Sequence, residues 1–97
     1  MYTELSLYID GQFLQGGGRR EHDVLNPATN LPVGKLPHAT HADLDLALST
    51  AQRAFESWRK SSPLQRSQIL RKVGELMRER AQAIGRNITL EQGKPLA

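Results

Sequence analysis

The sequence predicts an α/β chain, with a β-hairpin and short strands first and two or three amphipathic helices after them. Three observations carry this prediction. Apolar residues alternate around an Asp-Gly pair near the start, prolines and glycines interrupt the residues that follow, and from Thr40 apolar residues recur every three or four positions. Alternation is the period of a strand, and spacings of three and four are the period of a helix. We therefore expect strands and turns in residues 1–39 and helices in residues 40–97.

The first predicted element is a β-hairpin. In residues 5–9 every second residue is leucine or isoleucine, and residues 12–15 resume the extended pattern after Asp10-Gly11. Asp-Gly between two such runs favours a type I′ turn, because both central residues of that turn need a positive φ. The glycines at 16–18 precede no helix start, so we expect a loop without regular structure through His22 rather than a phosphate-binding loop.

A second turn and an edge strand are predicted next. Residues 26–30, Asn-Pro-Ala-Thr-Asn, have the composition of a turn, because Pro27 fixes φ and the Asn side chains bond the local backbone. Residues 31–36 form a short extended run that contains Pro32 and Gly34 and is closed by Pro37. Prolines this close together favour an edge strand or an irregular segment over a central strand.

The first helix is predicted to begin after Thr40. Thr40 is a good N-cap, and Asp43, three residues later, supplies the acidic partner of a capping box. The spacing of the apolar residues that follow places them on one face of the helix. This stripe comprises Leu44, Ala47, Leu48, Ala51, Ala54, Phe55 and Trp58.

A second helix start lies at Ser62, with Pro63 in the first helical position and Gln65 completing a capping box. The apolar period then continues to Gly93, which is longer than the ~8–20 residues of a usual globular helix. We therefore expect a break near residues 79–83, a third helix after it, and a left-handed Gly93 at its end. The predicted buried face comprises Ile69, Leu70, Val73, Leu76 and Met77, and it continues through Ala81, Ile84, Ile88 and Leu90.

The charge of the chain is unevenly distributed. Residues 1–50 carry three basic and six acidic groups, whereas residues 51–97 carry ten basic and four acidic groups. Such a basic excess marks either a nucleic-acid or membrane surface or a solvated helix face. We favour the solvated face, because Glu75 and Glu79 interleave with the basic residues and no aromatic residue lies among them to stack on bases. We expect no nucleic-acid and no membrane partner; the alternative is a small basic interaction or nucleic-acid-binding module.

The residues offer little chemistry. The chain has no cysteine, which removes disulfides, thiolate metal sites and a cysteine nucleophile. His38 and His41 have a spacing that would place two nitrogens on one metal if both lay on a helix. They straddle the predicted helix start, so we interpret them and His22 as surface histidines. The lack of cysteine fits a cytoplasmic location.

The order of the motifs resembles the N-terminus of the aldehyde dehydrogenase superfamily. The resemblance covers the hairpin of residues 7–13, the turn of residues 26–29, the helix end Phe55-Glu56-Ser57-Trp58 and the helix of residues 66–72. Residues 89–97, TLEQGKPLA, resemble the TLEQGKPLAEA stretch of the succinate-semialdehyde dehydrogenase branch. The chain stops two residues before that stretch ends, which we interpret as truncation.

The resemblance implies that residues 1–97 are part of a Rossmann-like cofactor-binding domain, with the catalytic and oligomerisation domains absent. Full-length members oxidise an aldehyde to an acid with NAD or NADP. A cysteine thiolate attacks the aldehyde, hydride passes to the nicotinamide, and a glutamate activates the water that hydrolyses the thioester. None of these groups lies in this chain, so we assign no catalytic and no cofactor-binding residue to it. We expect an inactive scaffold, a parent acting on succinate semialdehyde as a homodimer or homotetramer, and the rest of that parent as its partner.

The resemblance also implies one candidate ligand set. Some members hold a monovalent cation with backbone carbonyls before the Asn-Pro turn and an acidic side chain before the Gly-Lys-Pro. The matching positions here are Val24, Leu25 and Glu91. Carbonyl and carboxylate oxygens are suitable ligands for a hard cation. The alternative is that Glu91 caps a helix or pairs locally.

Overall fold

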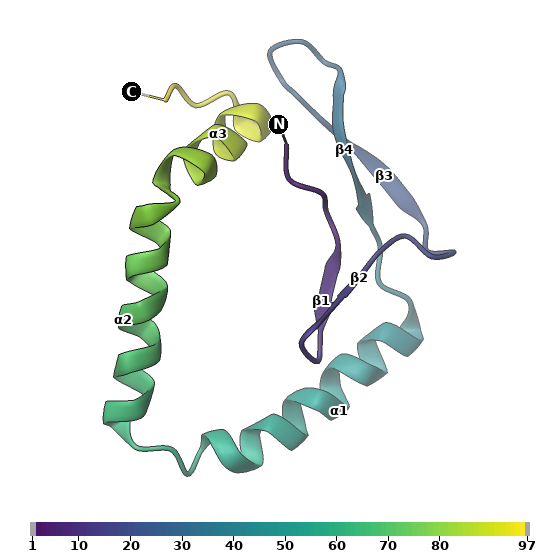
Figure 1. The fold of residues 1–97 in the computed structure, drawn as a ribbon. Coiled ribbons are helices and arrows are strands. Elements are labelled where there is room, and N and C mark those ends of the chain that lie inside the picture. The colour runs from purple at the N-terminus through teal and green to yellow at the C-terminus, as the bar shows by residue number, and fades with distance from the viewer. Residues whose placement is uncertain (1, 97) are drawn as a thin grey trace.

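The computed structural model describes residues 2–96, and in it four short strands are followed by three helices. The strands lie together, α1 leads away from them, α2 runs along the opposite side, and α3 returns toward the strands (Figure 1). The predicted α/β architecture is therefore confirmed. The elements are β1 (Leu7–Ile9), β2 (Gln12–Leu14), β3 (Glu21–Leu25), β4 (Pro32–Pro37), α1 (His41–Trp58), α2 (Pro63–Glu79) and α3 (Ala81–Gln92).

The predicted hairpin is present as the antiparallel pair β1–β2. Asp10 and Gly11 have φ values of 53° and 73°, the two positive values that a type I′ turn requires. Tyr8 pairs with Phe13 across the strands, and their ring centroids lie 4.8 Å apart. The first strand begins at Leu7 rather than Leu5, so the hairpin is shorter than the alternation predicts.

A second antiparallel pair, β3–β4, corrects one expectation. The sequence predicts a loop through His22, but Glu21 and His22 are the first two residues of β3. Four of the five residues of this strand are exposed, and the sheet has only two strands. Since neither side of the strand needs to be apolar, its sequence shows little alternation. β4 is an edge strand, as its prolines predict.

The helix boundaries follow the predicted signals. Thr40 with Asp43, and Ser62 with Gln65, form reciprocal capping boxes at the starts of α1 and α2. The expected break falls at Arg80, which ends α2 and precedes α3. Gly93 closes α3 with a φ of 79°, in the left-handed region.

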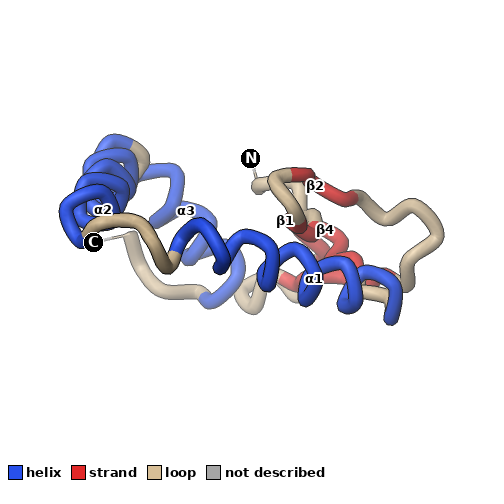
Figure 2. The backbone as a smooth tube through the Cα atoms, turned by 90° about the horizontal axis from the view of Figure 1, so that it is seen from below, coloured by secondary structure: helices blue, strands red, loops and turns tan. Residues whose placement is uncertain are grey.

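The chain is a single open layer. Its extents are 48 × 36 × 15 Å, and the smallest is close to the ~10–12 Å diameter of one helix. Figure 2, seen from below, shows the same thin profile. The radius of gyration is 17.0 Å, compared with about 13 Å for a compact domain of this length. The accessible surface is 7967 Å², compared with about 5,500 Å² for a compact protein of this mass.

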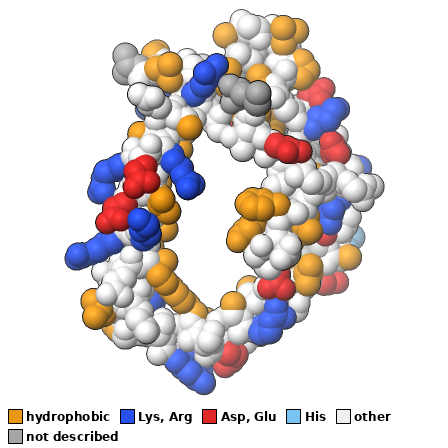
Figure 3. All heavy atoms as spheres, in the orientation of Figure 1, with side chains coloured by type: hydrophobic (Ala, Val, Ile, Leu, Met, Phe, Trp, Pro, Cys, Tyr) orange, Lys and Arg blue, Asp and Glu red, His pale blue; other side chains and the backbone are white. Residues whose placement is uncertain are grey.

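The apolar stripes have no cover in this layer. Among the described residues 2–96, no aliphatic or aromatic side chain of the hydrophobic class is buried, whereas Pro37 and Asp43 are. Most of the α2 face that the sequence predicts to be buried is exposed, including Val73 at 46% and Met77 at 55%, and Leu76 is half-buried. This face is uncovered in the chain by itself, and its burial against the rest of a longer chain, which the family resemblance implies, stays a prediction. Figure 3 shows hydrophobic side chains bordering the opening in the middle of the layer.

Candidate cation site and the contacts around it

Glu91 lies in the last turn of α3, next to the turn that follows β3. The evidence of proximity comes from Gly93, where an added Cβ would lie 3.5 Å from Cγ of Pro27. The end of α3 therefore rests against the Asn26-Pro27 turn. This contact brings the helix end that carries Glu91 toward the strand end that carries Val24 and Leu25.

The end of β3 is irregular. Val24 pairs with Gly34 and Leu25 with Pro32, with a register shift between the two pairs. Pro32 has no N–H, so it cannot donate a hydrogen bond to a carbonyl across the pair. A bulge and a missing donor are features that leave backbone carbonyl oxygens available for another partner. Carbonyl oxygens of this kind, together with a carboxylate, fit a hard monovalent cation.

The carboxylate of Glu91 already has one partner. The Tyr2 hydroxyl donates a hydrogen bond to its Oε1. Partial burial, followed by the hydrogen bond and the charge of Glu91, raises the pKa of Tyr2 to about 12. A carboxylate has two oxygens and about four acceptor positions, so this one bond leaves Glu91 able to accept others. Nothing in the sequence signals the pair, because 89 positions separate the two residues.

A bidentate ion pair joins the glycine-rich loop to the start of α1. Nε and Nη2 of Arg19 donate to Oδ2 and Oδ1 of Asp43, each over 2.7 Å. Asp43 Oδ2 also accepts from the backbone N–H of Thr40 over 2.9 Å. Arg19 and then Thr40 hold the pKa of the Asp43 carboxyl well below its usual range. These partners satisfy the carboxylate within the chain, so we interpret the pair as structural.

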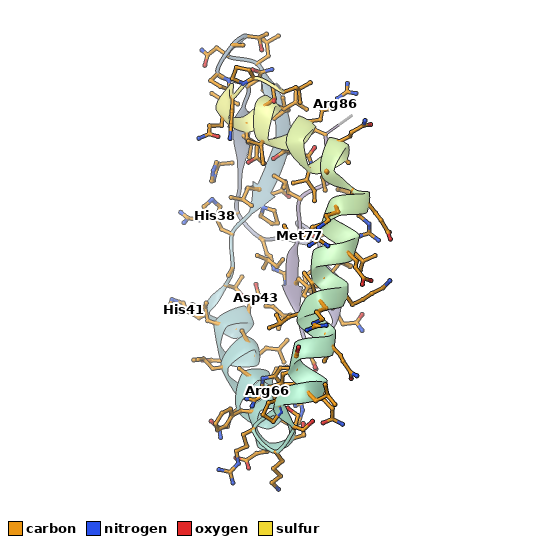
Figure 4. All side chains as sticks on the ribbon, turned by 90° about the vertical axis from the view of Figure 1, so that its left-hand side faces the viewer. His38, His41, Asp43, Arg66, Met77 and Arg86 are labelled. Atoms are coloured by element: carbon orange, nitrogen blue, oxygen red, sulfur yellow. The ribbon has the colours of Figure 1, made fainter. Side chains whose placement is uncertain are left out.

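The histidines are arranged differently from the spacing considered in the sequence. Nε2 of His38 lies 2.5 Å from Nδ1 of His22, which is part of β3. His41 lies apart from them as the first residue of α1, and Figure 4 labels it together with His38. No group of three or more His, Asp or Glu side chains within residues 2–96 could hold a metal ion. The two-histidine contact therefore has no third ligand in the part of the chain that the structure describes.

No helix within residues 2–96 has the length and apolar character needed to cross a membrane. The absence of cysteine from the whole sequence leaves the chain without the thiolate nucleophile that the family resemblance calls for. The polar clusters described above are a carboxylate beside a turn, an ion pair and a histidine pair.

Comparison with solved structures identifies the architecture. The chain superimposes on the N-terminal region of an aldehyde dehydrogenase from Bartonella henselae with a TM-score of 0.91 and 25% identity, covering 99% of this chain and 20% of that one. It matches a putative methylmalonate-semialdehyde dehydrogenase from Sinorhizobium meliloti, solved with NAD, with a TM-score of 0.89 and 29% identity, again covering 99% and 20%. The fold is thus that of one segment of these larger α/β proteins.

Sequence comparison gives the family. The aldehyde dehydrogenase family profile matches residues 13–97, and the chain belongs to that family. It is 43% identical over 93 residues to the mouse protein named methylmalonate-semialdehyde/malonate-semialdehyde dehydrogenase [acylating], mitochondrial. The match covers 96% of this chain and 17% of the mouse protein. The superfamily prediction is confirmed, whereas the succinate-semialdehyde branch finds no support, and the basic-module alternative is not favoured.

Proposed function

We propose that these 97 residues are a scaffolding part of the cofactor-binding domain of an NAD(P)-dependent aldehyde dehydrogenase. The observation that carries the proposal is the uncovered single layer: no aliphatic or aromatic side chain of the hydrophobic class within residues 2–96 is buried, although the helices carry long apolar stripes. A family match that spans 17% of the mouse relative supplies what would cover them, namely the rest of the enzyme chain. Burial of such stripes is the main favourable term in folding.

The chemistry of the parent follows from the family, not from this segment. In the family a cysteine thiolate would attack the aldehyde carbon, NAD or NADP would supply the hydride acceptor, and water or another nucleophile would take the acyl group from the resulting thioester and regenerate the thiolate. This chain has no cysteine. Its residues therefore contribute shape to the enzyme, and the isolated chain should not oxidise an aldehyde.

The substrate that we propose is a short aldehyde that also carries a carboxylate. The terminal motif in residues 89–97 predicts succinate semialdehyde, whereas the mouse relative is named for methylmalonate and malonate semialdehydes. The shared class is a semialdehyde, and the 43% identity supports the malonate type over the succinate type. Residues that line the aldehyde site lie outside these 97 positions, so only the parent enzyme can decide between them.

The direct experiment combines an intact mass with an assay. The mass of the source polypeptide is measured, and its oxidation of malonate, methylmalonate and succinate semialdehydes is followed with NAD and with NADP. A chain several times heavier than 10.8 kDa that reduces the cofactor supports the proposal. Turnover by the purified 97-residue chain would contradict it.

A second arm of this assay concerns the fate of the acyl group. The mouse relative is named an acylating enzyme. The parent is assayed in the presence and absence of coenzyme A as the thiol acceptor. A thioester product supports the acylating reaction, and a free acid formed at the same rate without the acceptor supports hydrolysis.

We further propose that Val24, Leu25 and Glu91 hold a monovalent cation in the parent. The approach of the α3 end to the turn after β3 supports this assignment. Replacing Glu91 by Gln removes the negative charge and should weaken any dependence of the parent on potassium or sodium. An unchanged dependence on both ions would contradict the assignment.

Oligomeric state and location are also proposals for the parent. We propose a homodimer or homotetramer, which light scattering of the full-length protein tests. The sequence favours the cytoplasm, although the mouse relative is named a mitochondrial protein. Fractionation of the source cells distinguishes the two locations.

A further inference from the structure

We propose that Tyr2 is a positioning residue for Glu91: its hydroxyl holds one carboxylate oxygen and so fixes how the carboxylate faces the end of β3. The inference rests on the cation site proposed above, and it names a residue outside the three assigned to that site. Three contacts of Tyr2 and Thr3 carry it, two to α3 and one to β4.

The first contact is the hydrogen bond from the Tyr2 hydroxyl to Oε1 of Glu91. Hydrogen bonds to a charged acceptor are stronger than neutral ones and restrict the acceptor's rotamer. A glutamate has three rotatable side-chain bonds and loses that freedom when it binds an ion. A carboxylate that is already held by Tyr2 has lost part of this freedom, which favours binding.

The second contact seats the Tyr2 ring on β4. An added Cβ at Gly34 would lie 3.0 Å from both Cδ1 and Cε1 of Tyr2, so the ring rests directly against the Gly34 backbone. Gly34 is the cross-strand partner of Val24. Tyr2 therefore bridges the two sides of the proposed site, with its ring on the partner of one proposed ligand and its hydroxyl on another.

The third contact anchors the neighbouring residue to the same helix. Nδ2 of Asn87 donates to Oγ1 of Thr3 over 2.6 Å. Asn87 and Glu91 are four residues apart in α3 and hence lie on one face of the helix. Residues 2 and 3 thus lie along that face with two attachments, which sets the direction from which the Tyr2 hydroxyl approaches.

The test uses thermal unfolding of the full-length protein at increasing potassium chloride, with ionic strength held constant by N-methylglucamine chloride. Tyr2→Phe keeps the ring and removes the hydroxyl. We expect the potassium concentration that gives half of the stabilisation to rise by about three- to tenfold, since one charge-assisted hydrogen bond is lost. Tyr8→Phe is the matched control, because Tyr8 is 64% exposed and its ring lies beside that of Phe13, away from Glu91. It should leave the midpoint unchanged.

A second variant disturbs the contact between Tyr2 and Glu91 while leaving the Tyr2 hydroxyl in place. In Gly34→Ala the added methyl displaces the Tyr2 ring, which should raise the potassium midpoint in the same direction. Combining it with Tyr2→Phe should add little, because both changes disable one contact. Full additivity of the two changes would contradict the seat of the ring on Gly34.

Two outcomes separate this inference from the cation site itself. If Glu91→Gln abolishes the potassium effect while Tyr2→Phe keeps the wild-type midpoint, the site stands and the role of Tyr2 is overturned. If Glu91→Gln leaves the potassium effect intact, the cation site fails, and a double-mutant cycle of the two variants without potassium decides whether Tyr2 holds Glu91. Additive effects in that cycle overturn the pairing, and coupling supports it.

Discussion

The strand region and α2 are held in place by different means. In residues 2–96 the long-range side-chain hydrogen bonds connect the strand region to α1 or α3, or join β3 to β4 or to His38 just after it. None of them reaches α2. Arg19–Asp43, Arg53–Asp10 and Tyr2–Glu91 are examples. α2 has a capping box at its start and a contact with α3 at its end. The strand region thus makes its own polar attachments, whereas α2 depends on burial of its apolar face.

The largest expected effect comes from placing a charge on that apolar face. Val73→Asp in the full-length protein should cost on the order of 4 kcal/mol in the free energy of unfolding, because it buries an unpaired carboxylate. In the isolated chain, where Val73 is 46% exposed, the same change should be within about 0.5 kcal/mol. Urea unfolding measures the effect of Val73→Asp in the full-length protein, and the helicity of the isolated chain reports the effect there.

The control for this comparison is Glu75→Gln, on an exposed position of α2. It should leave both proteins within about 0.5 kcal/mol of wild type. A small effect of Val73→Asp in the parent would mean that the apolar face of α2 stays uncovered there. The strand region and α2 would then not differ in how much they depend on burial.

The next effect concerns the ion pair that the strand region supplies for itself. Because the pKa of Asp43 is lowered from 3.8, its carboxylate stabilises the fold above that pH, and this stability is lost as the pH falls below it. Asp43→Asn should lower the melting temperature at pH 7 by more than loss of a single helix cap does. It should also make the fall of the melting temperature between pH 4 and 2 less steep than in the wild type. Asp45→Asn, at an exposed neighbouring position, is the control. If the melting temperatures of Asp43→Asn and the wild type fall equally steeply below pH 4, the stabilising role of the Arg19–Asp43 pair is contradicted.

A smaller effect is expected at the corner between α1 and α2. The Ser62 hydroxyl accepts from the backbone N–H of Gln65 over 3.1 Å. Ser62→Ala should cost about 1 kcal/mol by chemical denaturation. Ser49→Ala, inside α1, replaces a serine by a better helix former and should be neutral or slightly stabilising. Equal results for the two variants would show that the cap does not matter to α2.

The smallest effect belongs to a surface pair of α2. Nζ of Lys72 lies 3.5 Å from Oε2 of Glu75, and both side chains are more than half exposed. Lys72→Gln should change stability by no more than about 0.5 kcal/mol, and that change should shrink further at 1 M salt. A loss as large as that of the Ser62 cap would mean that polar contacts do hold α2.

The elements that the sequence predicts well are those with local signals. Asp10-Gly11, the boxes at Thr40 and Ser62, and Gly93 each act within a few residues, and the structure confirms all four. Glu21 and His22 were misplaced in a loop because an exposed two-stranded sheet needs no apolar alternation. The apolar period of α2 shows which side of the helix is apolar, but it does not show which part of a protein covers that side.

The candidate site was less accessible to sequence reasoning. Val24, Leu25 and Glu91 came from the family resemblance, since carbonyl ligands leave no mark on residue type. Tyr2 and Arg19 went unnoticed because their partners lie 89 and 24 positions away. Pairs of this kind depend on how the elements meet in space, and no local spacing encodes them.

A layer 15 Å thick has consequences for the order in which a longer chain would fold. Ribosomes add about 5–20 residues per second, so an early segment waits while the rest is synthesised. During that wait the capping boxes and hairpin turn can form, but the apolar stripes stay in contact with water. They are then available to chaperones, or to one another in neighbouring nascent chains, until the later residues arrive to cover them.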